Sequence, residues 1–197
     1  MVIGRGFAWA HLPRTAGTAT LAMFELFPDL VDFADPAESE DQHATFGDRA
    51  ARVEGKVLSL NFRRLPAWVL SRAQRVALHG VEPDYRPAAM QSPHELSRSN
   101  LPDRRLDLFT GAGRFEIDRW LRVEHLADDF LGLVAEFRDT THDEQQRVRG
   151  VGQVNAIDYD HDVSHWFTAA RLRDMYACNP SWTKLEERVY GSLMLDL

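Results

Sequence analysis

The first 80 residues contain two short apolar runs, and each is followed by a stretch with helical spacing. Residues 7–10 (Phe-Ala-Trp-Ala) and residues 56–62 (Lys-Val-Leu-Ser-Leu-Asn-Phe) have the length and β-favouring composition of buried strands. Residues 21–27 predict a helix that a proline stops, and residues 66–79 predict a helix that a proline opens. This order of strand, helix, strand and helix is typical of an α/β fold with a parallel sheet.

The second half of the chain continues this order and then becomes helical. An alternating pattern over residues 115–123 predicts a third strand, and apolar residues at helical spacing predict a helix after it, to about residue 137. Ser164 is expected to cap a short helix, and further helices are expected over residues 168–176 and over residues 179–190. Residues 81–113 lack periodicity and predict a long loop with one short helix near residues 93–96. The expected fold is an open parallel sheet flanked by helices, with a helical C-terminal part.

Composition and charge narrow the class of protein. The 197 residues suffice for a full core, so we expect a single domain over residues 1–197. A formal net charge of -7 argues against a general nucleic-acid binder. Cys178 is the only cysteine, which excludes an intramolecular disulfide and a cysteine-based zinc site. With no run of membrane-spanning length and no signal-peptide pattern, a cytoplasmic, bacterial protein is the simplest expectation, and the oligomeric state stays open.

Residues 11–20, His-Leu-Pro-Arg-Thr-Ala-Gly-Thr-Ala-Thr, lie between the first predicted strand and the first predicted helix. They combine a cation, Arg14, with a glycine, Gly17, and three threonines. Free N–H groups at a helix start point at an anion, glycine lets the backbone approach it, and hydroxyls and a guanidinium complete its shell. The pattern favours a phosphate site, although the same residues would also serve an ordinary helix start. It is not a Walker A loop, whose lysine is missing.

Two arginines, Arg63 and Arg64, directly follow the second predicted strand, and Ser71 lies in the helix after it. In open parallel sheets ligands bind beyond the carboxyl ends of the strands, which is where both arginine-bearing turns are expected. An arginine at a strand end and a hydroxyl in the next helix can hold one phosphate together. The alternative is that both arginines are solvated and that Ser71 lies on the helix surface.

The first turn resembles the loop that binds the 5′-phosphosulfate of PAPS (3′-phosphoadenosine 5′-phosphosulfate) in sulfotransferases, commonly written H-I-P-K-T-G-G-T. The matching positions are His11, Pro13, Thr15, Gly17 and Thr18. Arg14 stands where most of the family has lysine. The second turn resembles the family's 3′-phosphate segment, an arginine before a proline and then a serine, but here the serine is one residue closer to the proline. That spacing leaves open whether Arg63 or Arg64 is the matching residue.

This resemblance implies a P-loop-NTPase-like fold and the transfer of a sulfuryl group from PAPS to a hydroxyl, with PAP as the product. The residues that would bind the co-substrate are Pro13, Arg14, Thr15, Ala16, Gly17 and Thr18 for the 5′-phosphosulfate, and Arg63 or Arg64 with Ser71 for the 3′-phosphate. Arg14 would also stabilise the leaving phosphate. The acceptor would be a carbohydrate or another small molecule, and residues 81–113 would line its side of the site.

His43 lies between the two turns in the sequence, where several glycan sulfotransferases have their base. Sulfuryl transfer requires the acceptor oxygen to lose a proton, and a histidine that is neutral near pH 7 suits that role. The alternative is an exposed loop histidine without a role in catalysis. His11 is expected to be packed at the end of the strand and takes no catalytic role.

Two other functions stay open at this point. A small-molecule kinase of the same fold class would need the Walker lysine, which the first turn lacks. A non-catalytic nucleotide-binding or scaffolding domain gains some support from Arg14, because arginine is too basic to protonate a leaving group. A metal is not expected, since the histidines and aspartates of residues 158–165 lack compact ligand spacing.

Overall fold

The computed structural model describes residues 1–36, 43–79, 92–152, 154 and 158–195. The chain divides into two compact units. The sheet unit comprises Met1–Phe62 and Asp107–Asn155, and the helical unit comprises Arg63–Leu106 and Ala156–Leu197. All the strands that the structure describes belong to the sheet unit.

The sheet unit is built on a five-stranded sheet with the strand order β3-β1-β2-β4-β5. Its strands are β1 (Val2–Ile3), β2 (Phe7–Ala10), β3 (Phe33–Ala34), β4 (Val57–Phe62) and β5 (Arg119–Arg122). β2, β4 and β5 run parallel, whereas β1 is antiparallel to both β2 and β3. The predicted α/β class is confirmed, but the sheet is mixed rather than entirely parallel. The three residues between β1 and β2 leave room only for a hairpin, which pairs strands antiparallel.

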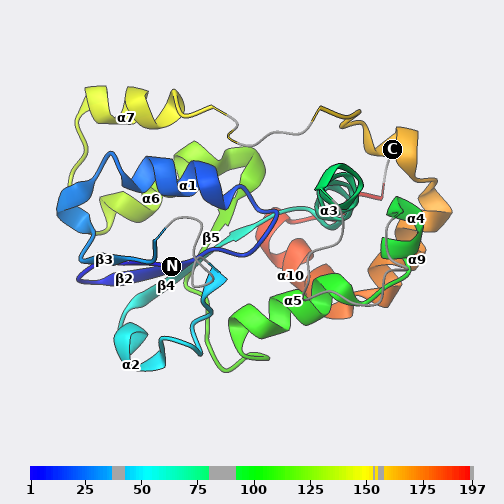
Figure 1. The fold of residues 1–197 in the computed structure, drawn as a ribbon, viewed down its shortest axis with the longest axis horizontal. Helices are drawn as coiled ribbons and strands as arrows, with labels where there is room; N and C mark the ends of the chain where they lie inside the picture. Colours follow the sequence, from blue (N-terminus) through cyan, green and yellow to red (C-terminus); the bar gives the residue numbers. More distant parts are fainter. Residues whose placement is uncertain (37–42, 80–91, 153, 155–157, 196–197) are drawn as a thin grey trace. The chain divides into compact units, whose positions relative to one another are not determined.

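Helices cover the face of the sheet on which Phe7 and Trp9 lie. The helices of this unit are α1 (Gly17–Phe24), α2 (Ala50–Val53), α6 (Leu126–Ala135) and α7 (His142–Arg149), with 3-10 turns η1 (Pro28–Leu30) and η3 (Val123–His125). Phe24 of α1 stacks on Phe7 at 5.5 Å and meets Phe130 of α6 edge-on at 4.9 Å, centroid to centroid. Figure 1 shows α1 and α6 on one side of the sheet and α2 on the other. This packing fixes α1, and the turn that precedes it, against the sheet.

The helical unit is held by the packing of its helices. They are α3 (Leu65–His79), α4 (Pro93–Leu96), α8 (Val163–Trp166), α9 (Ala169–Cys178) and α10 (Pro180–Tyr190), together with the first residues of α5 (Leu101–Thr110). Trp68 of α3 packs on Trp182 of α10 with ring centroids 5.4 Å apart, and both side chains are buried. Asp103 caps α10 by accepting hydrogen bonds from the N–H groups of Ser181 and Trp182. No helix in the described part of the chain is long and apolar enough to cross a membrane.

The strands at β2 and β4 and the helices α3 and α10 confirm the pattern-based prediction, but three details differ. The predicted loop over residues 81–113 is wrong where α5 lies, and its residues 81–91 lie outside the described residues. α7 was not predicted, because Val148 is its one buried residue and a single position creates no periodicity. α8 is capped by Asp162, which accepts the N–H of Ser164, and not by Ser164 itself.

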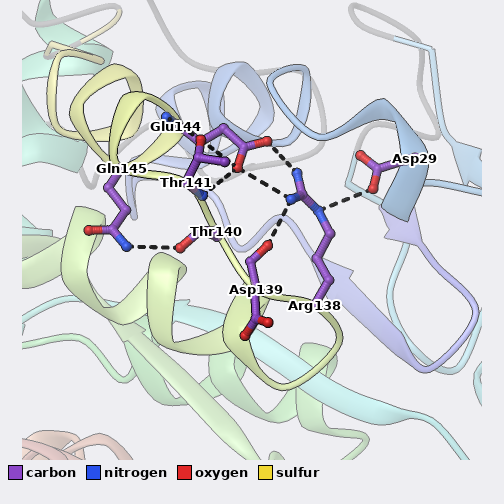
Figure 2. A network of polar contacts seen from close by, with 7 residues as sticks. All are labelled: Asp29, Arg138, Asp139, Thr140, Thr141, Glu144 and Gln145. Atoms are coloured by element: carbon purple, nitrogen blue, oxygen red, sulfur yellow. Dashed lines mark hydrogen bonds and ion pairs between the residues drawn. The ribbon is translucent and has the colours of Figure 1, made fainter.

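A network around Arg138 connects the end of α6 to α7 and to the segment that follows α1 (Figure 2). Arg138 pairs with Asp29 at 3.1 Å and with Glu144 at 2.6 Å, and its guanidinium carbon lies 4.9 Å from the ring centroid of Phe27. Glu144 also completes a capping box with Thr141 at the start of α7. The hydrogen bond from Arg138, and next that from the backbone of Thr141, lower the pKa of Glu144 to about 2. The network restrains the chain where it leaves α1.

Candidate phosphate-binding turn

The turn from His11 to Ala16 connects β2 to α1 through an uncommon backbone conformation. Arg14 and Ala16 have φ angles of 70° and 61°, in the left-handed region that residues with a Cβ rarely adopt. Each such residue costs roughly 1–2 kcal/mol, and backbone strain of this kind clusters at ligand sites. α1 begins at Gly17, earlier than the apolar pattern predicts, so the predicted phosphate turn leads directly into the helix start.

Ala16 is the N-cap residue of α1, and its side chain cannot accept a hydrogen bond from the helix N–H groups. The first turn of α1 also contains no acidic residue. Among the other described helices of eight or more residues, a side-chain oxygen accepts an N–H at the start of α3 (Glu186), α7 (Thr141), α9 (Thr168) and α10 (Asp103), and α5 and α6 have acidic residues in their first turn (Asp103, and Asp128 with Asp129). The start of α1 therefore has the composition of an anion site.

Gly17 is required by the way His11 packs against the turn. A Cβ at residue 17 would lie 1.8 Å from Cδ2 and 2.0 Å from Nε2 of His11, far inside van der Waals contact. Thr15 is fully buried and donates its hydroxyl to the carbonyl of Leu12 at 2.6 Å. The half-buried residues of the predicted 5′ site are Pro13, Arg14, Ala16 and Thr18. The structure thus places the six predicted residues in one turn, with Thr15 and Gly17 on its buried side.

His11 is packed, as expected, and is 6% exposed. Burial, and next the neighbouring His43, lower the pKa of His11 from 6.5 to about 3, so its ring is neutral at pH 7. The ring centroid lies 5.6 Å from that of Trp9 and 4.5 Å from that of His43. Among the described residues, its buried Nδ1 has no hydrogen-bond partner. A polar atom without a partner is thus buried beside the turn, which is uncommon in folded proteins.

Asn61 of β4 holds the turn from the neighbouring strand, and it was not among the predicted site residues. Its amide nitrogen donates to the carbonyl of Thr15 at 2.6 Å and to the hydroxyl of Thr20 at 2.7 Å. Its amide oxygen accepts the indole N–H of Trp9 at 2.8 Å. The signal that would have found it is the pair Ser59 and Asn61, polar residues two positions apart, and hence on one face, in an otherwise apolar strand.

His43 is exposed and lies beside the first turn, although 32 residues separate it from His11 in the chain. Its Nδ1 lies 3.1 Å from the carbonyl oxygen of His11. Because a carbonyl oxygen only accepts, Nδ1 carries the proton in this contact and donates it, which leaves the lone pair on Nε2. This is the tautomer that can take up a proton at Nε2.

The residues predicted for the 3′-phosphate belong to the helical unit. Ser71 is 3% exposed and does not lie on the surface of α3. Arg63 is half-buried, and its carbonyl accepts the indole N–H of Trp182 at 3.1 Å. Arg64 is also half-buried, donates to the carbonyl of Ser192 at 3.0 Å, and lies over an aromatic ring of α10. The alternative that Ser71 lies on the helix surface is therefore wrong, and the guanidinium of Arg64 is held by contacts within the protein.

Glu186 of α10 is fully buried and connects Arg64 to the start of α3. Its carboxylate accepts the N–H of Leu65 at 2.7 Å, the hydroxyl of Tyr176 at 2.8 Å and the guanidinium of Arg64 at 3.3 Å. Burial raises the pKa of Glu186, and these three hydrogen bonds oppose the rise. The carboxylate of Glu186 is thus the internal counter-charge both for the N-terminus of α3 and for Arg64.

A cavity of about 470 Å³ lies at the amino-terminal end of β4, away from the turn that follows β2. Its charged lining residues are Glu54, Lys56, Arg114, Glu116 and Asp118. Lys56 donates to the carbonyls of Gly4 and Arg5, and Asp118 accepts the N–H of Leu58, so part of this lining is engaged within the protein. The mixture of charges favours no particular ligand.

Comparisons with known proteins assign no family to the chain. No protein-family model matches it, and neither the curated proteins nor the solved structures gave a match. In the described residues, no group of three histidine, cysteine, aspartate or glutamate side chains is placed to hold a metal ion. The function must therefore be argued from the chemistry of the turn and its neighbours.

Proposed function

We propose that the protein is a PAPS-dependent sulfotransferase in which β2, the turn and α1 act as a P-loop-like phosphosulfate site. The observation that supports this most is the turn itself, in which Arg14, Gly17 and a helix start without a side-chain cap come together after a strand with a parallel neighbour. Ligands of open α/β sheets bind at the carboxyl ends of parallel strands. The resemblance of residues 11–18 to the phosphosulfate loop then names the anion.

The residues of the turn fit a 5′-phosphosulfate by their chemistry. N–H groups at the start of α1 are suited to phosphate oxygens, because Ala16 provides no competing side-chain acceptor. The absence of a side chain at Gly17 allows the ring of His11 to pack against the turn and support it from the protein side. Arg14 supplies a forked, delocalised cation, which would hold phosphate oxygens and stabilise negative charge on the leaving group.

Arg63 is the better candidate for the 3′-phosphate, together with Ser71. The charge of Arg64 is balanced by Glu186, and a phosphate bound there would have to displace a buried carboxylate from its cation. Arg63 keeps the spacing to Ser71 that the family pattern shows. Of the two residues that the shortened segment allows, we therefore propose Arg63.

In this proposal PAPS supplies the sulfuryl group, and PAP is released. The acceptor oxygen forms a bond to sulfur while the bond between sulfur and the 5′-phosphate oxygen breaks. His43 takes the acceptor proton at Nε2, because its Nδ1 donates to the carbonyl of His11. Arg14 holds the phosphate oxygens as negative charge accumulates on them. The acceptor that we propose is a hydroxyl of a carbohydrate or another small molecule.

Calorimetric titration with three nucleotides tests the binding site. PAP should bind and ATP should not, and 5′-AMP, which lacks the 3′-phosphate, should bind more weakly than PAP. Arg14→Ala should weaken the binding of both PAP and 5′-AMP by about 10- to 100-fold, which corresponds to the loss of charge-assisted hydrogen bonds. Arg63→Ala should weaken the binding of PAP and leave the binding of 5′-AMP unchanged. Arg5 is an exposed arginine between β1 and β2, and Arg5→Ala is the matched control, which should change neither affinity.

The outcomes separate the three candidate functions. Binding of ATP without PAP would overturn the proposal in favour of a kinase. Tight PAP binding, with no sulfuryl transfer from PAPS to any sugar or phenol in an acceptor panel, would leave a nucleotide-binding domain without this catalysis.

Substitution of His43 tests the mechanism independently of binding. His43→Ala should keep the PAP affinity within about twofold and lower the rate of transfer by at least about 100-fold, the usual loss on removal of a general base. His125→Ala, an exposed histidine of η3, serves as the control. Unchanged turnover in His43→Ala would remove this residue from the mechanism.

A further inference from the structure

One buried amide connects four elements of the sheet unit around the turn. Asn61 is 0% exposed and bonds Trp9 of β2, Thr15 of the turn and Thr20 of α1. Its orientation is fixed by the chemistry of its partners, because an indole N–H only donates and a backbone carbonyl only accepts. Both N–H groups and the oxygen of the amide are therefore engaged.

Thr20 extends this network to the helix start. Its hydroxyl accepts from Asn61 at 2.7 Å and donates to the carbonyl of Ala16 at 3.3 Å, and its own N–H also donates to that carbonyl at 3.1 Å. The carbonyls of two successive residues, Thr15 and Ala16, are thus both held on the protein side of the turn.

Holding these carbonyls determines where the N–H groups point. In a trans peptide the C=O and the N–H of the same plane point in opposite directions, and the described chain contains no cis peptide. The Thr15 carbonyl points at Asn61, so the N–H of Ala16 points away from Asn61. The Ala16 carbonyl points along α1, so the N–H of Gly17 points out of the helix start. These are the two amides that an anion at the start of α1 would meet first.

We propose that Asn61 is a positioning residue, which presets the N–H groups of Ala16 and Gly17 for the phosphosulfate by way of Thr15 and Thr20. This inference rests on the proposed function for the identity of the anion. The positive φ angles of Arg14 and Ala16 support it, because a strained turn needs surrounding contacts that over-determine its shape. Asn61 touches no ligand itself and acts through the backbone of the turn.

The test compares variants that remove different hydrogen bonds of this network. Thr20→Val keeps the β-branched shape of the side chain but removes the hydroxyl, whereas Thr20→Ser keeps the hydroxyl. Asn61→Leu removes all the bonds of the amide. Ser59→Ala is the matched control, because it removes a buried bond to Ala8 on the same face of β4 without contact to the turn. For each variant we would measure PAP affinity by calorimetry and, without ligand, the ¹⁵N–¹H resonances of Ala16 and Gly17.

Thr20→Val should weaken PAP by about 3- to 10-fold, and Thr20→Ser and Ser59→Ala should stay within about twofold of the unchanged protein. The Ala16 and Gly17 resonances should shift in Thr20→Val and not in Ser59→Ala. Asn61→Leu, in folded form, should weaken PAP binding and shift these resonances more than Thr20→Val does.

If Thr20→Val binds PAP as well as Ser59→Ala does, Asn61 is only a structural residue and the inference is overturned, while the proposed function stands. If the unchanged protein does not bind PAP, the proposed function fails, and the ligand-free resonances alone decide whether Asn61 sets the turn. Unshifted Ala16 and Gly17 resonances in Thr20→Val would overturn the inference in that case too.

Discussion

Two strand-to-helix junctions follow neighbouring parallel strands of this protein, and they differ in what meets the start of the helix. After β4, the N–H of Leu65 donates to the buried carboxylate of Glu186, which also pairs with Arg64. After β2, Ala16 is the N-cap residue of α1, and the first turn of the helix contains no acidic residue. The start of α3 thus has a carboxylate of the protein as its anion, whereas in the described residues no side chain caps the start of α1.

The difference teaches how an arginine beside a helix start should be interpreted. In the sequence, Arg14 and Arg64 look alike, because each follows a strand and precedes a helix. The carboxylate of Glu186, 122 residues away in the chain, neutralises Arg64, and this ion pair offsets the free-energy cost of burying the carboxylate. At the start of α1, where Ala16 provides no side-chain cap and the first turn contains no acidic residue, the positive end of the helix favours an external anion.

The largest effect should come from removing the internal anion. Glu186→Ala removes the carboxylate that pairs with Arg64 and that accepts from the N–H of Leu65 and the hydroxyl of Tyr176, and breaking a buried pair in this way costs about 3–5 kcal/mol. Urea denaturation would measure the loss. Glu186→Gln keeps an acceptor for Leu65 and should lose less. If the alanine variant were as stable as the unchanged protein, the contrast between the two junctions would have no energetic basis.

A second substitution probes the other junction. Gly17→Ala forces a methyl group against the ring of His11 and should cost about 1–3 kcal/mol, the range for overpacking a core. The displaced turn should also lose PAP affinity. Gly132→Ala in α6 is the matched control, because its Cβ meets nothing within 4 Å and a helix gains about 0.5–1 kcal/mol from this exchange. Losses of equal size at both positions would contradict the packing described for Gly17.

The pH dependence of stability sharpens the comparison, because a buried side chain that titrates in acid lies at each junction, His11 at one and Glu186 at the other. Burial lowers the pKa of His11 to about 3 and raises that of Glu186. Above pH 6.5 His11 is neutral in the folded and the unfolded chain. Below it, the unfolded chain takes up a proton that the folded one refuses, so stability falls by about 1.4 kcal/mol per pH unit until the pH nears 3.

The contribution of Glu186 has the opposite sign, since a raised carboxyl pKa favours the folded state below about pH 4.5 and loses that effect as the pH rises through the folded pKa. Urea midpoints of the unchanged protein and of His11→Gln between pH 7 and pH 5 isolate the histidine, because both proteins contain Glu186. The difference in stability between the two should change steadily over this range. Parallel curves would show that His11 does not titrate as its burial requires.

Local signals were enough to predict the elements that frame the turn. Residues 7–10 and 56–62 are apolar and short, and Pro66 and Gly191 mark the start of α3 and the end of α10. α5 and α7 were missed for a different reason. Both are largely polar, so periodicity could not reveal them, but the capping box formed by Thr141 and Glu144 is a sequence signal that precedes α7.

The site shows the same limit more clearly. The residues of the turn are contiguous, so a motif could name Pro13 to Thr18. The partners that set its shape or balance its charge come from elsewhere in the chain. Asn61 reaches Thr15 across 46 residues, and Glu186 reaches Arg64 across 122. The local sequence does not reveal that Arg64 pairs with Glu186, because tertiary packing brings that carboxylate to it.

The long reach of Asn61 has a consequence for how the protein matures. Its bonds to Trp9, Thr15 and Thr20 close chain segments of 52, 46 and 41 residues, so they form only after β4 has paired with β2. During synthesis the whole motif leaves the ribosome before residue 61 does. A nascent chain that ends short of β4 therefore contains every residue of the phosphate loop and still lacks the loop's shape.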